Sequence, residues 1–172
     1  MMRVGLRRNA KDLGAMLILA GLALLFFSPW LWQGLSLNQG DFPILGGPLF
    51  HWLHARYAQG GEALWIQGIA GGEPIADAQI TFAYYPLSRL LLTLFSGATA
   101  YVLHLALHTG LLALGCYALA RSYGSSRQGA FLGALCAGFG GAFTYSDNWF
   151  TVLVTLAWLP WALVGLRQAQ QA

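Results

Sequence analysis

Charge is what this sequence has least of. Only 9% of its 172 residues are charged and six of them are acids, whereas 57% are hydrophobic. A soluble protein of this length carries about a quarter charged residues. The deficit excludes an ordinary soluble domain and predicts an integral membrane protein.

The sequence also lacks the signatures of several common function classes. Its two cysteines, Cys116 and Cys136, lie in apolar runs without a metal-binding spacing, so we expect small buried hydrophobic side chains. It has no glycine-rich nucleotide fingerprint and no nucleophile elbow. Its nine lysines and arginines are too few for an extended basic surface. We therefore expect no nucleic-acid partner.

Apolar segments of membrane length dominate what is present, since a span needs about 20 residues. The first follows a basic start, but bulky residues such as Phe26 and Trp32 leave no small-residue cleavage site. We therefore predict that it is retained as a span. The fold class is all-α: a polytopic membrane protein in a single domain, residues 1–172, with four transmembrane helices at about 13–32, 98–120, 129–145 and 149–166.

Lysine and arginine decide the orientation. With the N-terminus in the cytoplasm, seven of the nine basic residues fall inside, and only Arg56 and Arg89 fall outside. Among the six acids only Asp12 falls inside. We predict that both termini are cytoplasmic and that a long loop, about residues 33–97, is extracytoplasmic. Long ordered loops often carry function, so an active site is expected there.

Two proline-led segments in this loop predict short helices. In PLFHWLHARYAQ, residues 48–59, the side chains of Leu49, Leu53 and Tyr57 recur at four-residue spacing. This stripe is typical of a helix in the membrane interface, with its apolar face toward lipid. PLSRLLLTLFS, residues 86–96, predicts either a second interfacial helix or an early start of the second span.

Glycines, acids and aromatic residues alternate between these two segments. Trp65 and Tyr84 supply aromatic rings, and Glu73 and Asp77 supply carboxylates, in a stretch too rich in glycine for a long helix. This composition suits a cleft that holds a polar ligand beside the bilayer. It equally suits an ordered cap that packs on the spans and leaves its acids in water. The residues alone leave both interpretations open.

His104 and His108 stand one helical turn apart in the second predicted span. Ionisable residues inside a membrane are functional candidates, so His104 joins the candidate binding residues. Alternatively, both histidines are neutral and hydrogen-bond neighbouring spans. No third ligand on this helix completes a metal site, and we predict none.

The last two predicted spans carry packing signals. The third has two rows of small residues at four-residue spacing, one through Gly129 and Gly133 and one through Ala130, Ala134 and Gly138. Such rows let helices approach closely. Pro160 in the fourth span removes a backbone hydrogen bond and predicts a kink.

Seven short motifs occur in a recognisable order: Gly40-Asp41, GEALW (61–65), GGEPIADAQ (71–79), YYPL (84–87), LHLALH (103–108), ALARSYG (118–124) and AWLPW (157–161). This order resembles the N-terminal part of the YfhO-like bacterial membrane proteins, which are similar to the GT-C class of glycosyltransferases. The resemblance covers about residues 38–166. It implies a bacterial inner-membrane protein of the cell envelope and the N-terminal portion of a larger GT-C-like fold. A further polypeptide could supply the remaining spans.

The resemblance implies transfer of a sugar from a polyprenyl-phosphate carrier to an acceptor on the extracytoplasmic face. The catalytic carboxylate of GT-C enzymes lies just after the first span, which is the position of Asp41. A carboxylate there could accept the proton of the acceptor hydroxyl. Arg56 and Arg89 are the candidates for the carrier phosphate.

Other residues of the outer loop complete the candidate site. Glu73 and Asp77 could bind sugar hydroxyls or assist Mg²⁺ or Mn²⁺, although no cofactor is firmly indicated. The alternative function is a non-catalytic membrane subunit whose outer loop binds a partner or a glycan lipid. The candidate substrate-binding residues are Arg56, Trp65, Glu73, Asp77, Gln79, Tyr84, Arg89 and His104.

Overall fold

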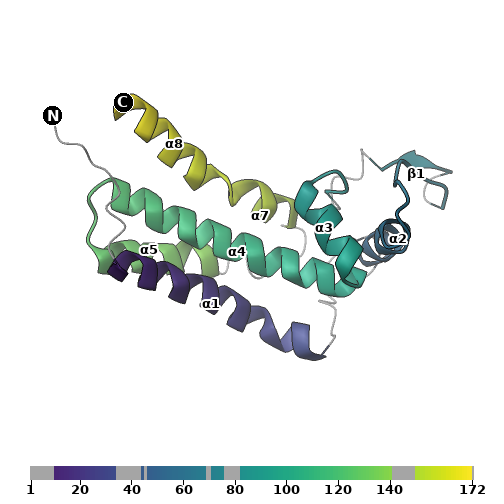
Figure 1. The fold of residues 1–172 in the computed structure, drawn as a ribbon, viewed down its shortest axis with the longest axis horizontal. Coiled ribbons are helices and arrows are strands. Elements are labelled where there is room, and N and C mark those ends of the chain that lie inside the picture. The colour runs from purple at the N-terminus through teal and green to yellow at the C-terminus, as the bar shows by residue number, and fades with distance from the viewer. Residues whose placement is uncertain are drawn as a thin grey trace. The chain divides into compact units, whose positions relative to one another are not determined.

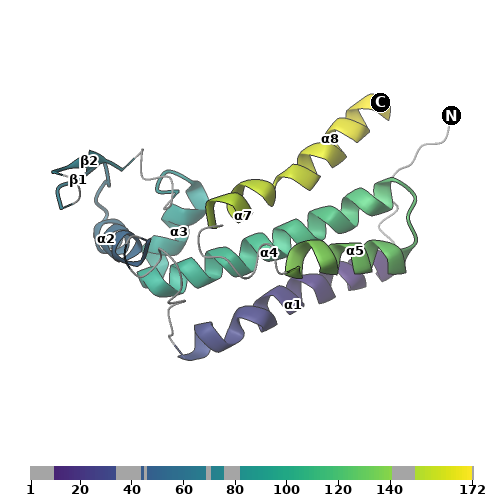
Figure 2. The same ribbon diagram turned by 180° about the vertical axis from the view of Figure 1, so that it is seen from behind.

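The structure, a computed structural model, describes residues 10–33, 44, 46–68, 71–75, 82–140 and 150–171. The described part is mostly helical, as predicted, and its elements follow one another along the chain as Figures 1 and 2 show. They are α1 (Ala10–Gln33), α2 (Gly47–Tyr57), β1 (Trp65–Ile66), β2 (Glu73–Pro74), α3 (Pro86–Leu94), α4 (Gly97–Ser122), α5 (Arg127–Phe139), α7 (Phe150–Leu156) and α8 (Leu159–Gln171).

The chain forms two compact units. Unit 1 comprises Met1–Phe26, Ala106–Tyr145 and Val152–Ala172, and unit 2 comprises Phe27–Leu105 and Ser146–Thr151. Unit 1 thus holds most of α1, the second part of α4, α5 and α8. Unit 2 holds α2, the two strands, α3 and the first part of α4.

Membrane-length helices occur at three of the four predicted places. Within the described residues, three helical segments are long and apolar enough to cross a membrane: Ala10–Gln33, Gly97–Ser122 and Phe150–Gln171. At the third predicted span, residues 129–145, the structure describes α5, whose 13 residues are fewer than the roughly 20 of a span. Residues 141–149 lie outside the described part. A fourth span stays a prediction.

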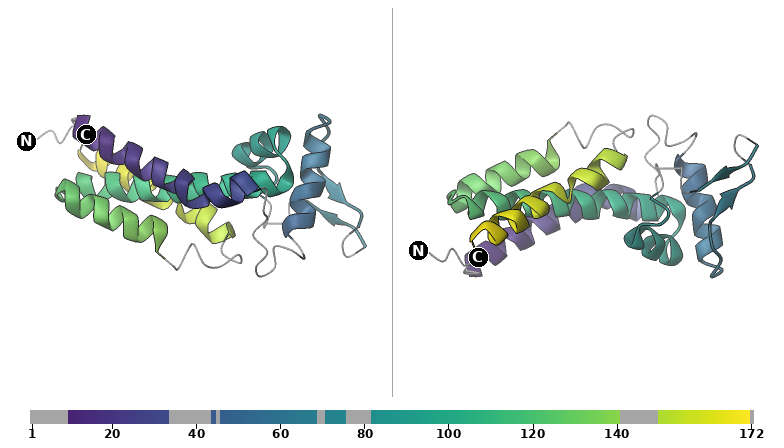
Figure 3. Two further views of the ribbon diagram at one scale, coloured as in Figure 1. Left: turned by 90° about the horizontal axis from the view of Figure 1, so that it is seen from below. Right: turned by 90° about the horizontal axis from the view of Figure 1, so that it is seen from above.

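In unit 1, α1 and α4 run side by side in opposite directions, as the views in Figures 1 and 3 agree. Asp12 in the first turn of α1 contacts Arg121 in the last turn of α4. The core between α1, α4 and α5 consists of small and aliphatic residues and one tyrosine: Leu19, Ala113, Tyr117, Ala130 and Ala134.

The two rows of small residues on α5 have different surroundings. Ala130, Ala134 and Gly138 are buried, and a Cβ added at Gly138 would lie 2.8 Å from the Cβ of Ala113 on α4. By contrast, a Cβ at Gly133 would meet nothing within 4 Å. The close helix approach that small residues allow is therefore made by the row Ala130, Ala134 and Gly138, which packs against α4.

Pro160 interrupts the last membrane-length segment, as predicted. Helix α7 ends at Leu156 and α8 begins at Leu159. Beyond the break, the indole Nε1 of Trp161 donates a hydrogen bond to the carbonyl oxygen of Leu111 on α4, at 2.9 Å. A Cβ at Gly115 would lie 2.7 Å from that nitrogen. Glycine is thus what lets the indole lie against α4.

In unit 2 the two short helices predicted between the first two spans are present. Proline stands in the first turn of both α2 and α3, where its missing N–H has no intrahelical partner to lose. Helix α3 ends at Leu94, and Phe95 is extended, with φ −129° and ψ 155°. Because α4 begins only at Gly97, α3 is a separate helix and not an early start of the second span.

The apolar stripe of α2 corrects one prediction. Leu49, Leu53 and Tyr57 are at most 5% exposed, and Phe50 is fully buried. The stripe therefore belongs to the protein core and does not lie toward lipid. The backbone of α2 also packs closely against residue 97. A Cβ added at Gly97 would lie only 2.7 Å from the backbone nitrogen of His51.

The outward apolar face of this unit lies on α3. Leu90 is 55% exposed and Leu94 is 63% exposed, whereas Leu91 and Leu92 on the other side are buried. Residues four apart share a helix face, so Leu90 and Leu94 form one exposed apolar edge. Helix α3 therefore has the two-sided character of an interfacial helix that the sequence suggested for both segments.

Candidate functional site

The predicted site residues divide into those that the structure describes and those that it does not. Asp41, Asp77 and Gln79 lie outside the described residues, so their predicted roles stay predictions. The other six lie in unit 2: Arg56, Trp65, Glu73, Tyr84, Arg89 and His104.

Arg89 on α3 is held by a carboxylate. Its Nη2 donates a 2.6 Å hydrogen bond to Oε1 of Glu62, and its guanidinium lies 5.5 Å from the centroid of the Tyr57 ring. The hydrogen bond to Glu62 raises the pKa of Arg89 above its ordinary value, so the cation is retained. A phosphate at Arg89 would compete with Glu62 for this charge.

Arg56, in the last turn of α2, has a different partner. Its guanidinium lies 5.5 Å from the ring centroid of Trp52, one helical turn earlier. Among the residues that the structure describes, no carboxylate lies within ion-pair distance of Arg56. The side chain is exposed. Of the two cations predicted to be extracytoplasmic, Arg56 is therefore the one better placed to receive an anion.

Two tyrosines form hydrogen bonds to the backbone of loop segments in unit 2. The buried Tyr57 hydroxyl donates to the carbonyl oxygen of Ala83 at 3.0 Å, and burial raises the pKa of Tyr57. Its phenol therefore stays neutral and keeps this hydrogen bond. Tyr84, 54% exposed, donates from its hydroxyl to the carbonyl oxygen of Ala63 at 3.3 Å. Tyr84 thus lies beside the segment that leads into β1.

Trp65 and Glu73 belong to a small antiparallel hairpin beside α2 (Figure 3), in which Trp65 pairs with Pro74 and Ile66 pairs with Glu73. The indole of Trp65 lies against Gly72, where an added Cβ would be 2.7 Å from Nε1. Gly72 has φ +112°, a conformation that suits glycine. Trp65 remains 52% exposed, so the hairpin presents its ring to the surface.

His104 lies in an aromatic core. It is fully buried, with its ring centroid 5.5 Å from that of Phe150 and 6.1 Å from that of Tyr85. Phe50 and Tyr101 pack in the same cluster. This burial separates His104 from the exposed side chains of Arg56, Trp65 and Tyr84. His104 therefore packs among aromatic rings, and the predicted hydrogen bond to a neighbouring span stays a prediction.

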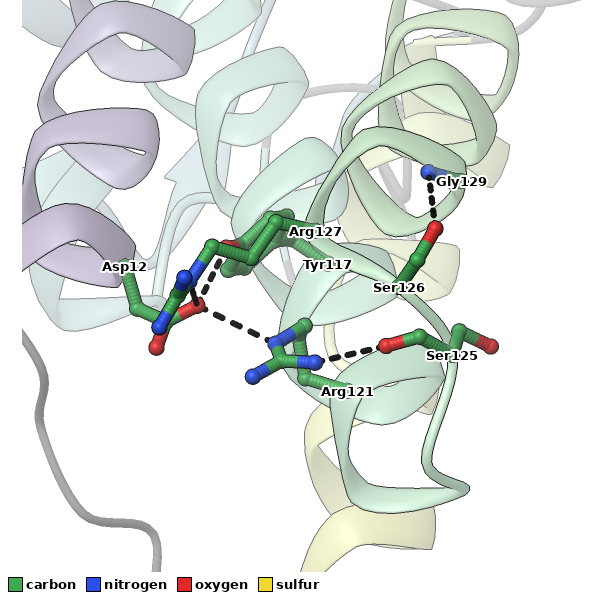
Figure 4. Close-up of polar contacts among 7 residues, drawn as sticks. All are labelled: Asp12, Tyr117, Arg121, Ser125, Ser126, Arg127 and Gly129. Carbon is green, nitrogen blue, oxygen red and sulfur yellow. Dashed lines mark hydrogen bonds and ion pairs between the residues drawn. The ribbon is translucent and has the colours of Figure 1, made fainter.

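Sequence reasoning missed a polar network in unit 1, shown in Figure 4. One oxygen of Asp12, Oδ1, accepts hydrogen bonds from the Tyr117 hydroxyl at 2.7 Å, Arg121 Nε at 3.0 Å and Arg127 Nε at 3.2 Å. Arg121 also donates from Nη1 to the Ser125 carbonyl oxygen at 2.6 Å. The one available signal was that Asp12 is the only acid on the predicted cytoplasmic side.

The described residues offer no metal centre. No group of three or more histidines, cysteines, aspartates or glutamates within them could hold a metal ion. Glu73 therefore belongs to no such group among the described residues. The role of Glu73 and Asp77 toward Mg²⁺ or Mn²⁺ stays a prediction.

Comparison of the chain with models of protein families, with curated proteins and with solved structures finds no match. The resemblance to the YfhO-like membrane proteins stays a prediction from the motifs. What the geometry adds is that three of the candidate residues in unit 2 are exposed: Arg56 on α2, Trp65 on β1 and Tyr84 in the turn before α3.

Proposed function

We propose that this chain is a membrane glycosyltransferase-like protein, or the N-terminal part of one, that binds a polyprenyl-phosphate-linked sugar on the extracytoplasmic face. The observation that carries the proposal is the exposed set Arg56, Trp65 and Tyr84 in the segment between the first two membrane-length helices. These residues combine one cation without a described carboxylate partner and two aromatic rings.

The exposed set matches the chemistry of a lipid-linked sugar. An indole offers a flat apolar face together with an N–H donor, which suits the ring and hydroxyls of a sugar. A guanidinium binds phosphate oxygens through paired N–H donors. The exposed Leu90 and Leu94 of α3 suit the bilayer surface, where such a carrier presents its head group.

Transfer would need a base and a means of stabilising the leaving phosphate. The acceptor hydroxyl oxygen would bond to the anomeric carbon while the bond from that carbon to the phosphate oxygen breaks. We assign the hydroxyl proton to Asp41 and the charge developing on the carrier phosphate to Arg56. Asp77 and Gln79 are assigned to sugar hydroxyls. Remaining spans would come from a longer chain or a second polypeptide.

The Glu62–Arg89 ion pair favours a second candidate, a non-catalytic membrane subunit that binds a glycan lipid or a partner. Glu62 offsets one of the two outer cations, which leaves Arg56 as the remaining one for a leaving phosphate. A protein that only binds the carrier needs less charge stabilisation than one that breaks its glycosidic bond. The two candidates share the binding surface and differ in transfer.

Binding is tested by photo-crosslinking a polyprenyl-phosphate sugar to the full chain in lipid nanodiscs. Arg56→Gln and Trp65→Ala should each lower crosslinking about tenfold, the loss expected when a charge-assisted hydrogen bond or a buried stacking contact is removed. Trp158→Ala is the matched control, because Trp158 is similarly exposed, at 49%, but lies in the third membrane-length segment. Undiminished crosslinking of both loop variants would refute the binding surface.

Catalysis is tested separately, with Asp41→Asn in the protein together with any further spans that it requires. Loss of sugar transfer with retained carrier binding supports Asp41 as the base. Unchanged transfer dismisses that assignment. Carrier binding without transfer by the native protein selects the non-catalytic subunit.

A further inference from the structure

One end of unit 1 gathers basic side chains from four helices. Lys11 and Asp12 begin α1, Arg121 ends α4, Arg127 begins α5 and Arg167 lies near the end of α8. Ion pairs with Asp12 and the contact of Arg167 with Tyr123 bring these elements together. These elements carry four described cations and one described carboxylate at this end, so the end has an excess of positive charge.

Arg167 is the first residue whose surroundings favour the binding of an anion by this excess of positive charge. Its guanidinium stacks 3.8 Å from the centroid of the Tyr123 ring. Its Nε is buried and has no hydrogen-bond partner among the described residues. No carboxylate among the described residues forms an ion pair with Arg167, so its guanidinium keeps a positive charge that an anion can meet through the terminal nitrogens.

Arg127 is the second residue whose surroundings favour the binding of an anion. Its Nε shares Asp12 Oδ1 with Arg121, so a single negative charge is divided between two guanidiniums. The Arg127 side chain is 38% exposed, and it stands at the first residue of α5, where the helix dipole adds positive potential. The guanidinium therefore has both charge and access to offer an anion.

The place of these arginines in the helices indicates which anion. Asp12 and Arg121 lie in the terminal turns of two membrane-length helices, so the cluster lies at a bilayer boundary. Phosphate groups of lipids are concentrated at that depth, and anionic lipids attract clustered lysine and arginine. The third membrane-length segment also ends here, with Arg167 in α8.

We propose that this end of unit 1 binds the phosphodiester head groups of anionic phospholipids. Arg127 and Arg167 contact phosphate oxygens, and Asp12 is a positioning residue that holds Arg121 and Arg127 at the lipid-facing end. The site is distinct from the unit 2 surface assigned to the sugar carrier, and it does not depend on glycosyl transfer. Its binding would hold the ends of four helices at one leaflet.

The test measures how far each lipid raises the unfolding temperature of the full chain in a neutral detergent. The probes are phosphatidylglycerol, phosphatidylcholine and inorganic phosphate. Phosphatidylglycerol should raise the temperature, with an effect that weakens as salt screens the charges. Phosphatidylcholine and inorganic phosphate should not. Arg167→Gln and Arg127→Gln should each weaken the apparent phosphatidylglycerol affinity about fivefold.

Gln168→Ala is the control variant, because Gln168 is an exposed, uncharged neighbour of Arg167 on α8, and it should leave the phosphatidylglycerol response unchanged. Each variant is compared with its own lipid-free unfolding temperature, so a loss of intrinsic stability does not mimic a loss of lipid binding. If Arg127→Gln does not fold, Arg167→Gln decides the test, since the described ion pairs of Asp12 involve Arg121 and Arg127 and not Arg167. An undiminished response of Arg167→Gln overturns the proposal, as does an equal response to phosphatidylcholine or inorganic phosphate.

Discussion

Two arginine–carboxylate clusters in this protein use the same chemical groups in different surroundings. In unit 2 the Arg89–Glu62 pair has the shorter distance, 2.6 Å, but its side chains are 52% and 55% exposed. In unit 1 Asp12 meets Arg121 at 3.0 Å and is only 16% exposed. Water screens the first pair and largely spares the second. Solvent, and not distance, is therefore expected to decide which cluster stabilises the fold.

The two clusters also differ in the number of hydrogen-bond donors that each carboxylate accepts. Asp12 Oδ1 accepts from Tyr117, Arg121 and Arg127, and so joins the start of α1 to α4 and α5. Glu62 joins one loop residue to Arg89 on α3. Removing the half-buried acceptor leaves several donors unsatisfied, whereas the exposed pair can exchange its partner for water.

The largest expected effect comes from Asp12→Ala, which leaves two arginines and one tyrosine without their shared acceptor. The free energy of unfolding should fall by about 3 kcal/mol, at the lower end of the cost of breaking a buried pair. Unfolding in mixed micelles with increasing denaturing detergent measures it. A loss no greater than that of Glu62→Ala, which removes the exposed carboxylate, would contradict the conclusion that the less exposed cluster contributes more to stability.

Gly97→Ala compares what backbone packing in unit 2 contributes to the free energy of unfolding with what the Glu62–Arg89 ion pair contributes. The new Cβ would lie 2.7 Å from the backbone of Phe50 and His51, and backbone cannot turn aside as a flexible side chain can. We expect a loss of about 2 kcal/mol, as for an overpacked core. The same unfolding assay applies to Gly133→Ala, which meets nothing within 4 Å and serves as control. Equal losses in both would contradict the close approach of α2 to Gly97.

Tyr117→Phe isolates one hydrogen bond of the buried cluster. Deleting the hydroxyl that donates to Asp12 should lower the unfolding free energy by about 1 kcal/mol. Tyr84→Phe deletes a 3.3 Å hydrogen bond on a side chain that is 54% exposed and should cause no measurable loss. If Tyr84→Phe proves the more damaging variant, exposure is not the deciding variable.

Glu62→Gln should have the smallest effect. It removes the charge that pairs with Arg89 but keeps an oxygen acceptor, at a site where water replaces the lost interaction. We expect the unfolding temperature to stay the same at low and high salt. A clear, salt-dependent loss would show that the exposed pair contributes to stability and would narrow the difference between the units.

The two loop helices show what sequence patterns capture. Proline at the start predicted α2 and α3 because its restricted φ and missing N–H suit a first helical turn. The stripe through Leu49 and Leu53 correctly identified one apolar face of α2 but assigned it to lipid, and the structure buries it. Periodicity shows that a face avoids water. It does not show whether lipid or protein covers that face.

The polar contacts were harder to foresee. Glu62 and Arg89 are separated by 27 residues, and Asp12 and Arg127 are separated by 115. A charged residue in a sequence shows what it can bind but not which partner the fold brings within reach. Both carboxylates could have faced water. Only the packing of α1 against α4 gave Asp12 three donors, and only the turn before β1 placed Glu62 beside α3.

The sequence by itself determined that this is a helical protein with membrane-length segments, where its short helices begin and where its last membrane-length segment is interrupted. Those properties follow from composition and local spacing, which act on neighbouring residues. Only the tertiary structure decided that α2 turns its apolar stripe inward, that His104 lies among aromatic rings and that Asp12 gathers two arginines. Burial and pairing depend on contacts between distant segments, and such contacts exist only once the helices have packed.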